Sequence, residues 1–422
     1  MGMMQDIFES EIKEQLSLHK IGTKLIRKKF GELGITLTDT QIAAIESKLC
    51  AYQGGTFTVS IDDDQLPVLN PKFGETIKNT LHFDLKESKE EIDKIIARFT
   101  NNLPKTIVEI AEGISEPILN KLKRDAPTML RSRRKEMGSF QMRLAKRWRK
   151  PLDLLEMFLV IALEAGENFN FEFRGKASKE NDYVFEALVR LHARACQNAS
   201  EVLALLKTGH ADGAMARWRS LHEIAAVGFF IKENGKEVAE RYLLHRAVES
   251  YKAAVQYQQY CKILGYKPFS IKEIKKITLN YQCLVNRFGP AYKGNYGWSA
   301  SALHKHNPTF VDIEKGAKLA HLRPFYKMAC QSVHATSQGI FFKLGLTDAN
   351  QGILLAGPSN AGLADPGEGT AISLEQITTA LLLTKPNIDA LVICKIMAKL
   401  THEIGEEFVL AQRALKNSES TK

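Results

Sequence analysis

The chain has 422 residues, of which 44% are hydrophobic and 25% charged, and its formal net charge is +10. This length has room for two or three domains with a substantial core, and no long low-complexity tract is present, which argues against a disordered chain. The first residues lack the basic-then-apolar order of a signal peptide, and the most apolar run, Leu154 to Ala165, is shorter than the roughly 20 residues that span a bilayer.

Residues 1–150 are expected to form an N-terminal, mainly helical region. Phe8, Ile12 and Leu16 give one apolar stripe, and Thr38 before an apolar run marks the start of a second helix. Alternation over residues 56–61 predicts a short strand, which ends in a turn at 62–64. Residues 86–150 are helical in pattern, with interruptions expected near Pro104, Pro117 and Pro127.

Residues 151–422 are expected to form a second domain, a helical bundle. Helices are predicted at about 151–166, 180–208, 211–233, 236–264, 271–288, 311–345 (broken near Arg323–Pro324) and 373–416 (interrupted at Pro386). A loop rich in Gly, Pro, Asn and Asp is predicted at 347–370. The fold class is therefore all-α, with at most a short strand pair in the N-terminal region.

The apolar stretch from Ala214 to Phe230 contains the most informative polar residues. Arg219 and Glu223 are spaced i, i+4 on a predicted helix, so an ion pair between them is geometrically natural. His222 lies on the same stripe. Ionised groups are costly to bury unless they are paired or used, so this cluster is either an internal structural pair or the floor of a site.

Two later stripes extend this interpretation. Arg241, His245 and Glu249 are spaced i, i+4, i+8, and Tyr326, Cys330 and His334 have the same spacing. If the helices pack around one axis, these side chains converge on one pocket. Histidine transfers protons near neutral pH, and arginine suits phosphate recognition. The alternative is that the stripes form internal ion-pair networks.

Several of these motifs resemble an uncharacterised bacterial family, domain of unknown function five-six-seven-seven (DUF5677). They are the run from Arg219 to Glu223, the segment Ala239–His245, Gly297–Trp298 and the block from Tyr326 to Thr336, in that order. The similarity covers about residues 180–345. It implies a helical bundle in which the Arg219, Glu223, Arg241 and His334 positions recur, and a bacterial stress or anti-phage setting, but no established activity.

The spacing Arg217-x4-His222 is similar to the Arg-x4–6-His motif of HEPN ribonucleases, helical proteins in which paired motifs across a dimer cleave RNA without metal. This resemblance implies a homodimer in which a histidine handles the 2′-hydroxyl proton and an arginine stabilises the phosphate charge. The sequence departs from that family at Trp218, where a polar residue is usual.

The net charge is concentrated in one segment. Residues 121–150 contain twelve Lys and Arg and two acidic residues, which accounts for the whole excess of +10. Arg131, Arg133, Arg134, Lys135, Arg143 and Arg147 with the aromatic Trp148 resemble the mixture that binds phosphates and stacks bases in sequence-tolerant nucleic-acid grooves. A solvated helix face and a basic helix on an anionic membrane are the alternatives.

No cofactor or metal is predicted. His304 and His306 lack neighbouring ligands at metal spacing, the Asp62–Asp64 run lacks the glycine and closing glutamate of a calcium loop, and phosphate-loop and hydrolase motifs are absent. Six scattered cysteines favour free thiols in a reducing cytoplasm.

Two functions are therefore expected of a cytoplasmic bacterial protein that binds nucleic acid, RNA rather than DNA. In the enzyme version, a metal-independent ribonuclease effector of stress or phage defence, His222 or His334 is the acid/base, Arg217 or Arg219 binds the phosphate and Glu223 orients them, while Arg241, His245 and Tyr326 bind substrate. In the other version the protein is a non-enzymatic binding or regulatory module whose polar cluster is structural. The ribonuclease version requires that a histidine faces a cleft beside an arginine.

Overall fold

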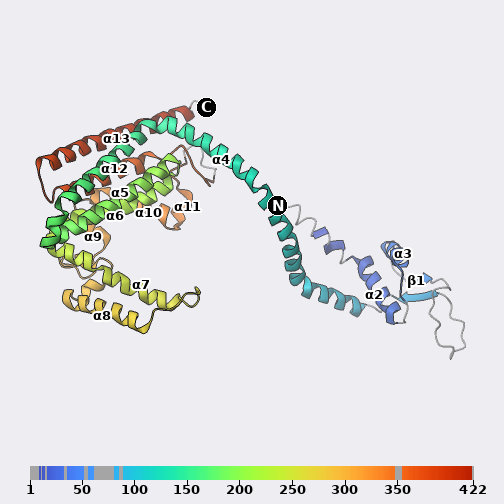
Figure 1. The fold of residues 1–422 in the computed structure, drawn as a ribbon. Helices are drawn as coiled ribbons and strands as arrows, with labels where there is room; N and C mark the ends of the chain where they lie inside the picture. Colours follow the sequence, from blue (N-terminus) through green and yellow to red (C-terminus); the bar gives the residue numbers. More distant parts are fainter. Residues whose placement is uncertain are drawn as a thin grey trace. The chain divides into compact units, whose positions relative to one another are not determined.

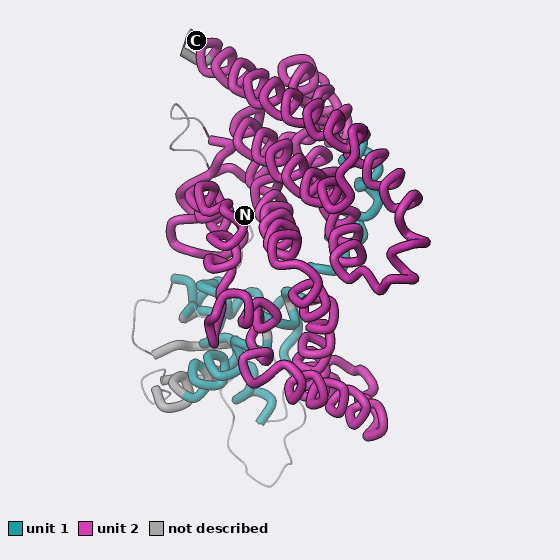
Figure 2. The backbone as a smooth tube through the Cα atoms, turned by 90° about the vertical axis from the view of Figure 1, so that its left-hand side faces the viewer, with its two compact units in different colours: residues 1–131 teal, residues 132–422 magenta. Residues whose placement is uncertain are grey.

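The computed structural model describes residues 9–10, 12–14, 17–32, 36–51, 56–60, 80–84, 89–346 and 354–420. Helices dominate these residues, and the predicted all-α class is confirmed (Figure 1). One antiparallel pair, β1 (Thr56–Ser60) with β2 (Thr80–Asp84), is the β structure of the described chain. The chain divides into two compact units, residues 1–131 and 132–422 (Figure 2).

Unit 1 contains two packed helices and the strand pair. The apolar side of α2 (Leu18–Glu32), including Leu25 and Phe30, is buried, as are Ile45 and Leu49 of α3 (Asp39–Cys50). Helix α3 starts after Thr38, as predicted, and the structure shows that Thr38 and Gln41 form a capping box. In the strand pair, residue 58 lies opposite residue 82. Phe8, Leu16 and the run 62–64 lie outside the described residues.

Helix α4 runs from Lys89 to Glu180 and contributes to both units. The predicted interruptions at its prolines are wrong, because within α4 only Trp148 departs from helical dihedral angles. A proline removes one backbone hydrogen bond, and its fixed φ is compatible with helix, so neighbouring turns can continue through it. The sequence placed the domain boundary near residue 150, whereas the units divide at 131/132. Leu144 and Trp148 already belong to the core of unit 2.

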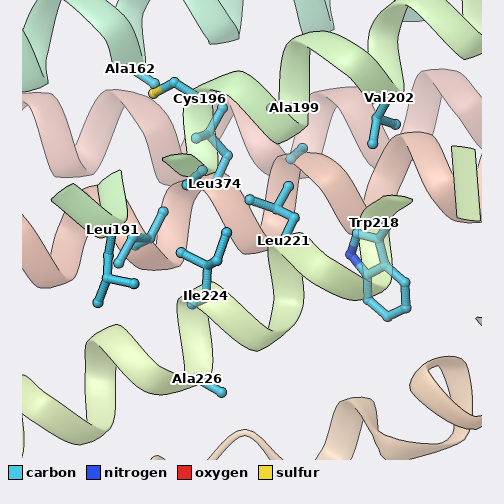
Figure 3. Packing of buried hydrophobic residues seen from close by; sticks show 14 of the residues in the cluster. Ala162, Leu191, Cys196, Ala199, Val202, Trp218, Leu221, Ile224, Ala226 and Leu374 are labelled. Carbon is cyan, nitrogen blue, oxygen red and sulfur yellow. The ribbon is translucent and has the colours of Figure 1, made fainter. Parts of the chain in front are cut away.

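The core of unit 2 lies between the later part of α4 and four other helices: α5 (Tyr183–Lys207), α6 (Ala211–Leu244), α12 (Ala364–Leu382) and α13 (Ile388–Ser420). Figure 3 shows Ala162 of α4, Ala199 of α5, Leu221 of α6 and Leu374 of α12 at this interior, and all four are at most 2% exposed. The α5–α6 turn passes through Gly209, whose φ of 79° is the left-handed conformation expected at this helix stop.

The remaining helices of unit 2 are shorter. They are α7 (Arg246–Tyr260), α8 (Ile271–Phe288), α9 (Phe310–Gly316), α10 (Arg323–Val333) and α11 (Ser337–Phe341). The predicted break before Pro324 is present, since α10 begins there. Gly235, at the predicted stop after residue 233, has a φ of 73° and kinks α6 rather than ending it. The loop predicted at 347–370 is shorter at its end, because α12 begins at Ala364; residues 347–353 are outside the described chain.

No helix in the described ranges combines the length and apolarity needed to cross a membrane.

We expect Gly166→Ala to lower the free energy of unfolding by about 1–3 kcal/mol, because overpacking a core displaces side chains and backbone. A Cβ at Gly166 would lie 2.4 Å from two atoms of the buried His192 ring. Gly175→Ala, in the same helix and with nothing within 4 Å of the added Cβ, is the matched control. It should be stabilising by about 0.5–1 kcal/mol. Equal effects of the two substitutions in urea denaturation would contradict this packing.

Candidate functional site

Arg219 and Glu223 of α6 meet Tyr326 of α10. The Nη2 of Arg219 lies 2.9 Å from Oε1 of Glu223 and donates to the Tyr326 hydroxyl at 2.8 Å, and that hydroxyl donates to the same carboxylate oxygen at 2.6 Å. The predicted ion pair is thus confirmed, although its side chains are 23% and 31% exposed rather than fully buried. Burial, and then the Glu223 carboxylate, raises the pKa of Tyr326, so the hydroxyl keeps its proton.

His222 points to a different partner, Glu314 of α9. Its Nε2 lies 2.9 Å from Oε1 of Glu314, and both side chains have no exposed surface. The other carboxylate oxygen accepts from Arg323 at 2.8 Å. Burial lowers the pKa of His222 against the opposing effect of Glu314, so the ring is neutral at pH 7. A carboxylate only accepts, so Nε2 carries the proton and Nδ1 is a buried acceptor without a partner among the described residues.

The Tyr326 ring joins these two groups. The guanidinium carbons of Arg219 and Arg323 lie 4.9 and 4.8 Å from its centroid, within cation–π range. We call the resulting set the Tyr326 cluster: Arg219, His222, Glu223, Glu314, Arg323 and Tyr326. Two arginines balance two carboxylates, and the histidine is neutral. The cluster connects α6, α9 and α10 with its charges satisfied, which is an arrangement typical of a structural network.

Arg217 does not join this cluster. Its guanidinium pairs with Glu201 and donates to Asn198, both on α5, whereas His222 faces α9. Five positions along a helix turn the side chain by about 140°, which sends the two residues to opposite neighbours. The arginine–histidine pair expected from the HEPN resemblance is therefore not formed within the chain.

His334 is also separate from Tyr326, contrary to the predicted stripe. Helix α10 ends at Val333, and His334 is its C-cap with extended dihedral angles (φ −103°, ψ 143°). The i, i+4, i+8 relation holds only while the helix continues, so the side chain leaves the stripe. His334 is exposed, and its imidazole has no hydrogen bond or ion pair to a described residue.

Arg241 and His245 contact the backbone of the 288–298 segment and not the Tyr326 cluster, which corrects the predicted convergence. Arg241 donates to the carbonyls of Trp298 and Phe288, and His245 Nε2 lies 3.1 and 3.0 Å from those of Tyr292 and Gly294. The Tyr292 hydroxyl returns a hydrogen bond to the Arg241 carbonyl at 2.7 Å. Burial lowers the pKa of His245. Carbonyls of the 288–298 segment thus lie against the Arg241 guanidinium and the Nε2 of His245, groups that the sequence assigned to a ligand.

The basic segment lies on the solvent side of α4. Within unit 2, positions 132–150 contain eight Lys and Arg residues, and all eight are exposed. Glu136 is the acidic residue of this stretch. Arg133, Arg149 and Lys150 form ion pairs with Glu136, Asp153 and Glu407. The other five have no ion pair to a described residue: Arg134, Lys135, Arg143, Lys146 and Arg147. Arg131, the last residue of unit 1, is exposed as well.

Trp148 is not part of that surface, so the prediction that it stacks on bases is wrong. It is 0% exposed, packs 6.0 Å from the Phe408 ring, and donates from Nε1 to the carbonyl of Asn360 at 3.0 Å. Trp148 is one helical turn from Leu144, which is also 0% exposed, so both belong to the core side of α4.

Residues 185–353 match DUF5677, a family of unknown function. No curated protein and no solved structure matches the chain. The segment matched to DUF5677 contains the whole Tyr326 cluster, Arg241 and His245. It excludes the basic part of α4, so the surface cations belong to a region outside the family match.

Sequence reasoning missed two members of the cluster inside the DUF5677 segment, Glu314 and Arg323. Glu314 lies between Ile313 and Lys315 on a short helix whose sequence also contains Asp312, so no local pattern distinguishes it from a solvent-exposed glutamate. Its partner His222 is 92 positions away, and no periodicity relates the two. Arg323 precedes Pro324, and the sequence predicts only a helix break at this position. In the described chain, no group of three or more His, Cys, Asp or Glu is arranged to hold a metal ion.

Proposed function

We propose that this protein is a non-enzymatic nucleic-acid-binding protein whose binding surface is the solvent side of α4 between Ser132 and Lys150. The observation that carries the proposal is the set of five exposed cations on this stretch that form no ion pair with any described residue. Eight basic residues with one acid is far from the mixed charge of an ordinary solvated face. A helix of this length spans about 27 Å, enough to follow several successive phosphates.

The arrangement favours contacts with the backbone of a nucleic acid. Exposed arginine and lysine side chains along a helix neutralise phosphates, whereas reading bases needs side chains that enter a groove or stack. Trp148 is buried and Phe140 is half-buried, so stacking residues are lacking on this face. We therefore infer binding that tolerates many sequences. RNA is the proposed partner, and the stress or anti-phage setting implied by the DUF5677 resemblance is the proposed context.

The ribonuclease alternative is less well supported by the geometry. General acid–base catalysis requires a group within hydrogen-bond reach of the substrate proton. His222 has no exposed surface and is paired with Glu314, and His334 has no arginine among its described partners. The Tyr326 cluster stabilises the packing of α6, α9 and α10 in this proposal.

Affinity for single-stranded RNA is expected to fall about 100-fold between 50 and 200 mM salt, if the five unpaired cations each neutralise one phosphate. Lys135→Gln/Lys146→Gln should lower the magnitude of the log K against log salt slope by about 1.4. Lys395→Gln/Lys399→Gln is the matched control, because it removes two exposed lysines of α13 that have no ion pair within the described part of the chain. Fluorescence anisotropy measures both slopes. Binding that ignores salt, or an equal loss in the control, would refute the proposed surface.

A further inference from the structure

The tip of the α7–α8 hairpin exposes large apolar side chains. Ile263 is 82% exposed, Leu264 61%, Tyr266 61% and Ile271 88%. They lie within nine positions, at the end of the hairpin that extends from α6 at the edge of unit 2 (Figure 1). Single exposed apolar residues are common, but four within nine positions form a feature that needs an explanation.

This exposure belongs to an ordered connection. The amide of Tyr266 donates to the carbonyl of Cys261 at 2.8 Å and that of Gly265 donates to Lys262 at 3.2 Å, which is a Schellman motif. Gly265 has the positive φ (74°) that this motif requires. Ser270 then starts α8 with a capping box. Because both helix ends are capped, the apolar side chains are held outward by a defined backbone.

Two further contacts fix the connection from its inner side. The Tyr257 hydroxyl donates to the carbonyl of Lys267 at 2.9 Å, and the amide of Phe269 donates to the Gln258 side chain at 3.0 Å. The rings of Tyr257 and Phe269 pack 4.8 Å apart. Phe269 thus supplies the inner packing of the connection, whereas Ile263, Leu264 and Ile271 are left to solvent.

Lysines surround the apolar tip. Five are exposed and have no ion pair to a described residue: Lys262, Lys267, Lys272, Lys275 and Lys276. Glu273 is the acidic residue of positions 261–276, and its carboxylate is used by the amide and hydroxyl of Ser270. The tip therefore combines a convex apolar end with a net charge of about +4 from these ionised side chains at neutral pH.

We propose that this tip binds the surface of a membrane that contains anionic lipids. Ile263, Leu264 and Ile271 enter the boundary between headgroups and acyl chains, Tyr266 lies at headgroup level, and the lysines contact anionic headgroups. A nucleic acid would neutralise the lysines but leave three aliphatic side chains in water, because they neither stack nor donate hydrogen bonds. A lipid surface accommodates the apolar and the cationic groups together. The inference is independent of the nucleic-acid surface on α4.

Vesicle flotation of the full chain tests this proposal. The parent should float with phosphatidylcholine vesicles containing one quarter phosphatidylserine and bind pure phosphatidylcholine at least about tenfold less tightly. Ile263→Ser/Leu264→Ser should weaken binding to the anionic vesicles at least about tenfold. Lys267→Gln/Lys272→Gln should reduce the preference for phosphatidylserine.

Matched controls separate this site from other surfaces. Ile271→Ser should weaken binding, whereas Phe171→Ser, which removes a side chain of similar exposure (90%) from α4, should not. Lys135→Gln/Lys146→Gln should leave vesicle binding unchanged. The proposal is overturned if the parent does not bind the anionic vesicles, if the tip variants bind like the parent, or if the α4 lysine variant loses vesicle binding to the same extent.

The depth of the tip gives a second readout. Tyr266→Trp places a fluorophore at the tip, while the natural Trp148, Trp218 and Trp298 are at most 3% exposed. Lipids brominated near the headgroup should quench the added emission more than the emission of the parent. Equal quenching of the two proteins would contradict insertion of the tip.

Discussion

Glu314→Ala is expected to lower the free energy of unfolding by about 3 kcal/mol, because it leaves a buried hydrogen-bond donor unsatisfied and removes the carboxylate that pairs with Arg323. The carboxylate has no exposed surface and accepts from both His222 and Arg323. Its loss leaves the Nε2–H of His222 unpaired in an interior that water does not reach. Urea denaturation followed by tryptophan fluorescence reports on unit 2, because all three tryptophans belong to its core.

Two companion variants make this result specific. Glu237→Ala breaks a glutamate–arginine pair of 3.7 Å whose carboxylate is 70% exposed, and it should cost less than about 1 kcal/mol. Glu314→Gln retains the shape and an acceptor for His222, so it should fall between the parent and Glu314→Ala, and it remains measurable if the alanine variant does not fold. If Glu314→Ala unfolds at the same urea concentration as Glu237→Ala, the Tyr326 cluster does not stabilise the bundle.

Unit 2 should lose stability as the pH falls from 6.5 to about 4, and His192 alone should account for about 3 kcal/mol of the loss. Burial lowers its pKa from 6.5 to about 4. Between these values the unfolded chain binds a proton that the folded chain does not, so acid favours unfolding. The contribution is fully present above pH 6.5. The lowered pKa values of His222 and His245 act in the same direction.

The variant His192→Gln isolates this effect. Burial raises the pKa values of Asp365, Glu368 and Glu375, so these carboxyl groups take up protons more readily in the folded state and oppose the histidines as the pH falls. They are present in both proteins and cancel in the comparison. The difference in unfolding free energy between pH 7 and pH 4 should be about 3 kcal/mol smaller for His192→Gln, which can still donate to Thr378. Parallel pH profiles would show that folding does not lower the pKa of His192.

Local patterns predicted the helical fold and part of the Tyr326 cluster. The capping box at Thr38, the helix stop at Gly209 and the Arg219–Glu223 pair each depend on residues within four positions, so the sequence determines them directly. The connection of His222 to Glu314 depends on how α6 and α9 pack, and no local pattern contains that information. The association of Tyr326 with arginine and glutamate is confirmed by its hydrogen bonds to Arg219 and Glu223, whereas its predicted role in binding substrate stays a prediction.

Orientation was the harder property to predict. Arg217 and Arg219 are both arginines in the same apolar stretch of α6. Only Arg219 faces α10, because side chains two positions apart on a helix point about 200° away from each other. The basic residues beside Trp148 in the sequence predict that it lies on the exposed face. It lies in the core instead, because it is on the same side of the helix as Leu144. The basic face itself was predicted correctly as an exposed surface for Lys135, Arg143 and Arg147, since burying so many unpaired charges is prohibitive.

The most direct test compares three proteins on one labelled single-stranded RNA at low salt: the parent, Lys135→Gln/Lys146→Gln and Tyr326→Phe. Anisotropy measures binding, and a denaturing gel of the same samples measures cleavage. The lysine variant should bind at least about fivefold more weakly, Tyr326→Phe should bind like the parent, and the RNA should remain intact in every sample. RNA cleavage by the parent that is lost in Tyr326→Phe, with binding unchanged in the lysine variant, would contradict this account and place the function in the Tyr326 cluster.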